Sequence, residues 1–193
     1  MRTRFLLAVA VILTAIPAYA QKSEWANYET PMQFTPIAFD LGAEYLGIQP
    51  EHSLLERTVA LGIGYGSMFL ITQGLKLAVH EQRPDGSNYH SFPSGHTAAA
   101  ITGAELIRQD YGWGWGAAFY ACGAAVAYGR VIHERHWWWD TLAGAGVGVL
   151  SAWIGRWATD ALDLGGTKKS NLAAAPSYDP LSGAYGAIVL MRF

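Results

Sequence analysis

Residues 59–79 read VALGIGYGSMFLITQGLKLAV, an apolar stretch interrupted by glycines. Together with its flanks it predicts a helix over residues 54–79, long enough to cross a bilayer or to form the middle of a bundle. Similar apolar stretches predict helices over residues 95–110, 113–132 and 137–162. The last of these contains LAGAGVGVLSAWIG, whose small residues allow neighbouring helices to approach closely. The sequence therefore predicts an all-α fold, a helical bundle with four core helices.

The first twenty residues have the features of a secretory signal peptide. Two arginines precede a short apolar run, and Ala18-Tyr19-Ala20 provides a cleavage site with small residues at its first and third positions. The apolar run is too short to span a bilayer comfortably, and a retained amphiphilic anchor is the alternative interpretation. We therefore expect an exported protein, located in the periplasm or in the membrane with its functional site facing the periplasm.

The rest of the chain is expected to divide into three parts. Residues 21–53 are cut by prolines and predict an N-terminal segment with short helices, such as one over residues 39–47. Residues 54–164 form the helical core, and residues 165–193 form a C-terminal tail of loop, whose last ten residues alternate weakly as an isolated strand would. Charged residues on the predicted helices leave open whether the bundle is soluble or partly embedded in a membrane.

Composition excludes several classes of protein. The chain is 51% hydrophobic and only 15% charged, so it is not disordered. Its net charge is -2 and it has no basic run, which argues against a nucleic-acid partner. The single cysteine, Cys122, excludes an intramolecular disulfide and a thiol-rich metal site, and it is expected in the core. The sequence does not indicate an oligomeric state.

Polar residues gather near the ends of the predicted helices. Lys76 and Arg83 lie around the end of the first long helix, and Arg130 lies near the end of the third. A guanidinium fork can hold two phosphate oxygens at once. Ser94 and Gly95 lie where a loop becomes a helix, so free backbone N–H groups there can point at an anion. These residues together predict an anion-binding cradle.

Two histidines would supply reactivity. His136 and Asp140 are four residues apart, so they share a helix face if the last helix begins by residue 136. The carboxylate could then bond one ring nitrogen and leave the other nucleophilic. His96 follows the glycine turn, where it could protonate a leaving oxygen. A metal interpretation of His133 with His136 lacks a well-placed third ligand, so no metal or other cofactor is expected.

The polar groups form the pattern K-x6-RP, PSGH and R-x5-H-x3-D between Lys76 and Asp140. This pattern resembles the three-part signature of the type 2 phosphatidic acid phosphatase superfamily. That family includes membrane lipid phosphatases, soluble periplasmic acid phosphatases and vanadium haloperoxidases. The segments HSFPSGHTA and HWWWDTLAGAGVG are more similar to the membrane-associated branch. Two departures are small: Gly129 stands where the family often has serine, and Thr141 where it often has valine.

The resemblance implies a role for each residue of the pattern. His136 would attack phosphorus, His96 would protonate the leaving group and Asp140 would orient His136. The residues that would bind phosphate are Lys76, Arg83, Ser94, Gly95 and Arg130. No metal takes part in this scheme.

The expected reaction is hydrolysis of a phosphomonoester or a diphosphate through a phosphohistidine intermediate. Lipid-linked substrates are favoured, for example lipid A, phosphatidic acid or a polyprenyl diphosphate, because apolar helices surround an exported site. Three alternatives stay open: a soluble periplasmic acid phosphatase acting on small phosphate esters, a vanadate-dependent haloperoxidase, and a non-catalytic phosphate- or lipid-binding module.

Overall fold

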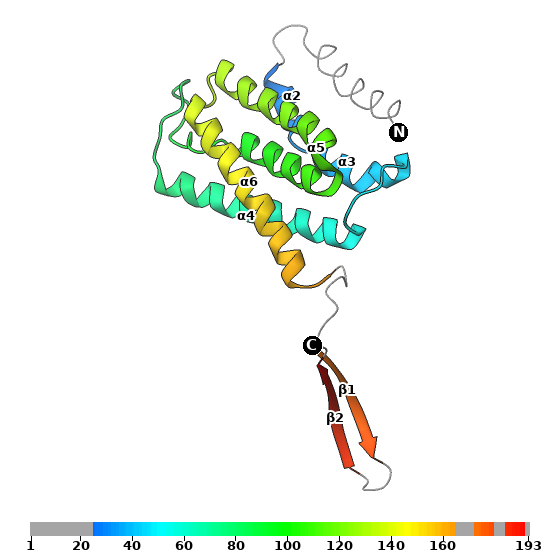
Figure 1. The fold of residues 1–193 in the computed structure, drawn as a ribbon. Helices are drawn as coiled ribbons and strands as arrows, with labels where there is room; N and C mark the ends of the chain where they lie inside the picture. Colours follow the sequence, from blue (N-terminus) through cyan, green and yellow to red (C-terminus); the bar gives the residue numbers. More distant parts are fainter. Residues whose placement is uncertain (1–24, 165–171, 180–183, 192–193) are drawn as a thin grey trace.

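The computed structural model describes residues 25–164, 172–179 and 184–191 (Figure 1). Helices make up most of this part of the chain, and the predicted signal peptide lies outside it. The elements in chain order are α2 (Trp25–Met32), α3 (Thr35–Gly42), the 3-10 helix η1 (Ala43–Leu46), α4 (Leu54–Ala78), α5 (Gly95–Ile132), α6 (Trp138–Ala161), β1 (Leu172–Asp179) and β2 (Ala184–Met191).

Helix α5 consists of two arms that meet at Gly112. This residue has φ of 76° and ψ of -178°, a backbone conformation that glycine adopts without steric cost and that reverses the direction of the chain. The two arms run along each other in Figure 1, and α4 and α6 pack directly against each other, since a Cβ at Gly155 of α6 would meet the carbonyl oxygen of Ala60 of α4. The predicted helices over 95–110 and 113–132 are these arms, so the expectation of four core helices in an all-α bundle is confirmed.

Small residues on α6 bring the core helices close together. A Cβ at Gly144 would lie 2.5 Å from the carbonyl oxygen of Ser94, and a Cβ at Gly148 would lie 2.7 Å from that of Ala98. The backbone of α6 therefore packs directly on the backbone of the first arm of α5, as the small residues of the sequence predicted. This contact fixes where the start of α5 lies relative to the start of α6.

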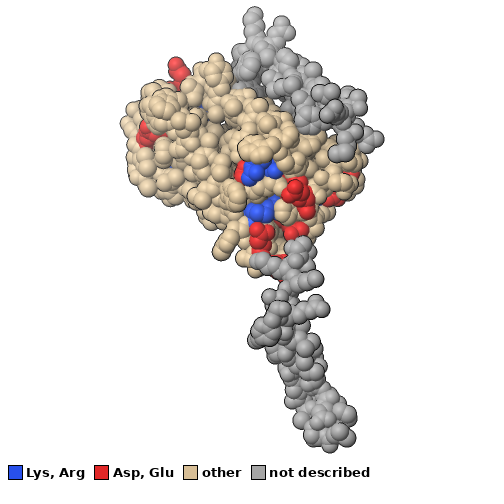
Figure 2. Space-filling model, viewed as in Figure 1, with Lys and Arg blue, Asp and Glu red and all other residues tan. Residues whose placement is uncertain are grey.

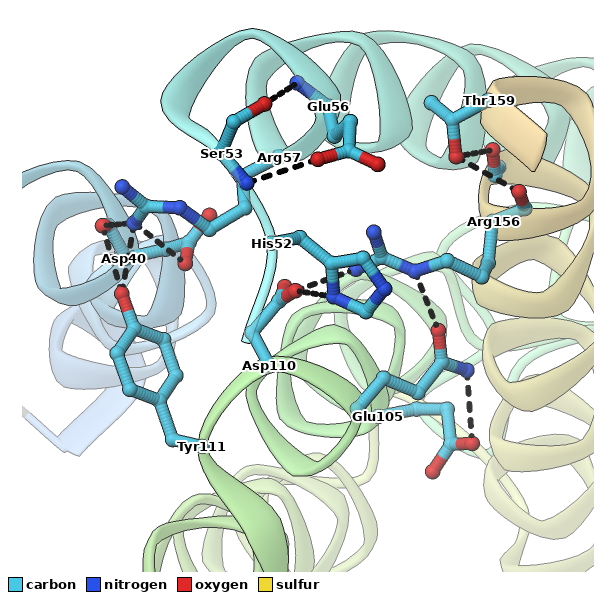
Figure 3. Close-up of polar contacts among 12 residues, drawn as sticks. Asp40, His52, Ser53, Glu56, Arg57, Glu105, Asp110, Tyr111, Arg156 and Thr159 are labelled. Carbon is cyan, nitrogen blue, oxygen red and sulfur yellow. Dashed lines mark hydrogen bonds and ion pairs between the residues drawn. The ribbon is translucent and has the colours of Figure 1, made fainter. Parts of the chain in front are cut away.

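The apolar core runs between these helices, and Cys122 is buried in it as expected. The charged residues of the predicted helices do not all face solvent. At the end of the bundle where α6 finishes, Arg57 donates a hydrogen bond to Asp40. Asp110 accepts one hydrogen bond from Arg156 at 2.6 Å and pairs with His52 at 2.7 Å (Figure 3). Burying such charges costs desolvation free energy, and removing one partner of a buried pair is strongly destabilising because it leaves the other charge unpaired.

The segments outside the core differ in part from expectation. The short helix expected over 39–47 begins earlier, at Thr35, because Pro36 fits the first turn of a helix, and it is followed by η1. The tail is not wholly loop: β1 and β2 pair antiparallel along their length. The weak alternation of the last residues was therefore a correct indication of a strand, although β2 has a partner and is not isolated.

Candidate active site

The predicted site residues gather at the end of the bundle where α4 and the second arm of α5 finish and where α5 and α6 begin (Figure 1). The loop over residues 79–94 closes this end. The structure places the residues as follows: Lys76 in the last turn of α4, Arg83 in the loop, Ser94 and Gly95 at the start of α5, Arg130 in its last turn, and His136 and Asp140 around the start of α6.

Lys76 holds the loop that precedes α5. Its Nζ donates to the carbonyl oxygens of His90 at 2.8 Å, Ser91 at 3.3 Å and Pro93 at 2.8 Å. An ammonium group has three donors, so in this arrangement all of them bond backbone. Lys76 therefore fixes the shape of the cradle and contributes positive charge to it, while direct contact with phosphate stays a prediction.

Two arginines carry buried donors that are not used within the protein. The Nε atoms of Arg83 and Arg130 are buried and have no hydrogen-bond partner among the described residues. A buried donor without an acceptor costs about 1–3 kcal/mol, so each of these N–H groups is available to an anion bound at this end of the bundle. Burial and then the positive charge of Arg130 lower the pKa of Arg83.

Ser94 organises the start of α5. Its Oγ accepts hydrogen bonds from the Thr97 hydroxyl at 3.0 Å and from the Thr97 N–H at 3.5 Å, and its own N–H donates to the Asp140 carbonyl at 3.0 Å. The hydroxyl proton of Ser94 and the first amides of the helix, at Gly95 and His96, are the donors that can turn to an anion. A helix N-terminus of this kind favours negative charge.

His136 and Asp140 are paired, although not for the reason that the sequence indicated. Helix α6 begins at Trp138, so His136 precedes it and the two residues do not share a helical face. Asp140 instead turns back over the helix start, where its Oδ2 accepts from the Trp137 N–H at 2.9 Å and lies 3.4 Å from His136 Nδ1. The hydroxyl of Ser91 donates to the same oxygen. A proton on Nδ1 directed at Asp140 leaves Nε2 of His136 with a free lone pair.

The electrostatic setting suits a nucleophilic imidazole. His136 is 2% exposed and Asp140 is fully buried. Burial lowers the pKa of His136, and the nearby Arg130, Lys76 and Arg83 lower it further, against the hydrogen bond to Asp140. Burial acts to raise the pKa of Asp140, but hydrogen bonds, first from His136 and then from Ser91, outweigh it and lower the value. At neutral pH the pair is therefore a neutral ring beside a carboxylate.

Several residues at this end carried no signal in the sequence. Glu29 of α2 forms an ion pair with Arg130 at 2.6 Å and a contact with His133 at 3.0 Å. His133 thus faces a carboxylate, and no group of three or more His, Cys, Asp or Glu side chains that could hold a metal ion occurs within the described ranges. The hydroxyl of Thr30 lies 3.5 Å from His96 Nε2.

Tryptophans form the rim of the site. Trp137 Nε1 donates to the Gln82 carbonyl at 3.0 Å, and Trp139 Nε1 donates to Glu81 at 2.8 Å. The rings of Trp137 and Trp139 stack with centroids 5.1 Å apart. These contacts tie the loop over residues 79–94 to the start of α6.

Residues 57–162 match the PAP2 superfamily, and the chain belongs to this superfamily. It is 35% identical over 106 residues to a lipid A 1-phosphatase of Porphyromonas gingivalis, a match that covers 53% of this chain and 24% of that relative. The chain therefore spans about a quarter of the length of that protein. A crystal structure of Aquifex aeolicus LpxE shares the fold, with a TM-score of 0.54 and 20% identity over 78% of this chain and 93% of that one. The resemblance seen in the signature is confirmed at the level of the family.

Proposed function

We propose that this protein is a metal-independent phosphatase that removes phosphate from a lipid-linked ester through a covalent phosphohistidine on His136. The observation that carries the proposal is a buried imidazole, oriented by Asp140, at one end of a bundle where Arg83 and Arg130 present buried, unpaired donors. This arrangement combines a nucleophile with a place for the charge of a phosphoryl group.

The reaction would take place in two steps. In the first, the lone pair of His136 Nε2 forms a bond to phosphorus as the bond to the leaving oxygen breaks, and His96 gives its proton to that oxygen. In the second, water attacks the phosphohistidine, His96 takes a proton from the water, and phosphate leaves with His136 restored. Arg83, Arg130 and the amides at the start of α5 would hold the equatorial oxygens through both steps.

A lipid-linked substrate is supported by the surface of the bundle. The face seen in Figure 2 is largely without charged side chains, and its charges gather toward the end where α6 finishes. Large apolar side chains, each more than half exposed, line the outer faces of α4 and α6: Phe69, Leu70, Leu77, Trp153 and Trp157. Exposed apolar surface of this extent indicates contact with lipid or with another protein.

Three further observations favour lipid. By length and composition α4 could cross a membrane, and 22% of its most apolar window is buried. The rim of the site carries Trp137, Trp138 and Trp139, and tryptophan is enriched at the interface between membrane and water. The Porphyromonas gingivalis relative is a lipid A 1-phosphatase. We therefore propose that the protein acts on a lipid phosphate at a membrane, outside the cytoplasm.

The test is phosphate release by the purified full chain from lipid A, phosphatidic acid, a polyprenyl diphosphate and a small soluble ester. Turnover of a lipid phosphate that persists in EDTA and is inhibited by orthovanadate supports the proposal. Turnover of the soluble ester alone would identify a periplasmic acid phosphatase instead. Halide oxidation with added vanadate would identify a haloperoxidase, and no turnover of any substrate would leave a binding module.

A further inference from the structure

Helix α2 reaches the site through one fully buried carboxylate. Glu29 is 0% exposed and uses both of its oxygens: Oε2 accepts from Arg130 Nη1 at 2.6 Å, and Oε1 lies 3.0 Å from His133 Nδ1. A buried carboxylate is costly unless it is paired. The burial of Glu29 beside Arg130, a predicted phosphate-binding residue, is therefore a feature of the site that needs an explanation.

The contact with Glu29 divides the guanidinium group of Arg130 into two parts. Nη1 is held by the carboxylate, whereas Nε is buried and has no partner among the described residues. A guanidinium binds a second anion along an edge that a first anion leaves free. Glu29 thus determines which edge of Arg130 can face a phosphoryl group.

Glu29 also acts on His96. The next residue of α2, Thr30, places its hydroxyl 3.5 Å from His96 Nε2, so the two side chains enter the same space. Burial, followed by the charge of Arg130, lowers the pKa of His96 to about 4, and Glu29 opposes this change.

The groups that face His96 from the surrounding elements are mostly cationic or neutral. Arg130 comes from the second arm of α5, Arg83 from the loop and His136 from the start of α6, and each lowers the pKa of His96. Glu29 is the acidic residue among these influences, and its charge is of the sign that retains a proton on the ring.

We propose that Glu29 is a positioning residue of the phosphatase site, which holds one nitrogen of Arg130, leaves the other edge for the phosphoryl group and supplies the negative charge that favours the proton-donating form of His96. This inference rests on the proposed function. It gives the N-terminal segment a part in the reaction, although that segment lies outside the three-part signature.

Two variants separate the effect of the charge of Glu29 from the effect of the length of its side chain. Glu29→Gln keeps the length and one acceptor oxygen but removes the charge, so the alkaline limb of the kcat–pH profile should move to lower pH by about one unit, the shift that one adjacent charge produces. Glu29→Asp keeps the charge but is one methylene too short for the contact with Arg130. Its alkaline limb should stay within about 0.3 units of the wild type, while KM rises.

Asp40→Asn is the matched control, because Asp40 is also a buried carboxylate paired with an arginine, Arg57, at the opposite end of the bundle. Asp40→Asn should lower the melting temperature but leave the alkaline limb of the kcat–pH profile and the KM unchanged. If Glu29→Gln and Asp40→Asn have the same effect, Glu29 has only a structural role and the inference is overturned.

An NMR titration of His96 in the absence of substrate keeps the inference independent of turnover. In Glu29→Gln the midpoint of the His96 titration should fall below that of the wild type, and an unchanged midpoint would overturn the inference. The wild type could also show no phosphatase activity while the His96 midpoint is still lower in Glu29→Gln. That result would support the link between Glu29 and His96 and would reject the proposed function instead.

Discussion

Asp140→Asn is expected to reduce kcat by about 10³–10⁴-fold while substrate binding is largely kept. In the native protein Asp140 Oδ2 lies 3.4 Å from His136 Nδ1 and accepts from the Trp137 N–H and the Ser91 hydroxyl. All three groups meet the same oxygen, so an asparagine oxygen in that position still accepts from them but carries no charge to stabilise the positive charge that develops on the ring as Nε2 bonds phosphorus. In the flipped rotamer the amide presents an N–H to Nδ1, so the ring of His136 must carry its proton on Nε2 and the nucleophilic lone pair is lost.

The assay is single-turnover formation of phosphoenzyme, together with steady-state phosphate release. Asp110→Asn is the matched control, because Asp110 is also a buried aspartate paired with a histidine, His52, and it lies at the other end of the bundle. Both variants should lose stability, by about 1–3 kcal/mol, because a charge-assisted bond is weakened in each. If Asp140→Asn stays within about threefold of the wild type, the effect expected of a lost tautomer is absent and the assigned role of the pair is wrong.

Three further predictions concern the acid, the packing and the pH dependence. His96→Ala should slow turnover of an alkyl phosphate by roughly 100-fold. It should slow turnover of a nitrophenyl phosphate much less, because that leaving group needs no proton. Equal losses of rate on both substrates would contradict the role of His96 as the general acid. Gly144→Ala places a Cβ 2.5 Å from the Ser94 carbonyl oxygen and should cost about 1–3 kcal/mol in thermal or chemical unfolding, whereas Gly146→Ala, with no described atom within 4 Å, should be neutral. The pKa of His136 is lowered, so this nucleophile stays neutral as the pH falls through the ordinary range of histidine. The acid limb of the kcat–pH profile should therefore lie below pH about 6.5. An acid limb above that pH would contradict the lowered pKa of His136.

The spacing of the motif made the core of the site predictable. Lys76, Arg83, Arg130 and the two histidines lie near helix ends in the sequence, and short connections bring the ends of a bundle together. The break in α5 at Gly112 is also predictable, because a glycine between two apolar stretches indicates the end of one helix and the start of the next.

Other features depend on tertiary packing and have no local signal. The Glu29–Arg130 pair joins residues 101 positions apart, and it forms only because α2 packs on the end of α5. The start of α6 at Trp138 follows from the way Asp140 caps the helix, which periodicity alone does not locate. Lys76 was expected to bind phosphate, but the three carbonyl oxygens that it contacts come from a loop whose path the sequence does not reveal.

The central claim is that His136 becomes covalently phosphorylated, and trapping of the phosphoenzyme tests it most directly. The protein would be mixed with a labelled lipid phosphate, quenched within one turnover and digested under alkaline conditions that preserve phosphohistidine. We predict acid-labile label on His136 in the wild type and in His52→Ala, and none in His136→Ala. Label on another residue, or rapid phosphate release by His136→Ala, would contradict the account.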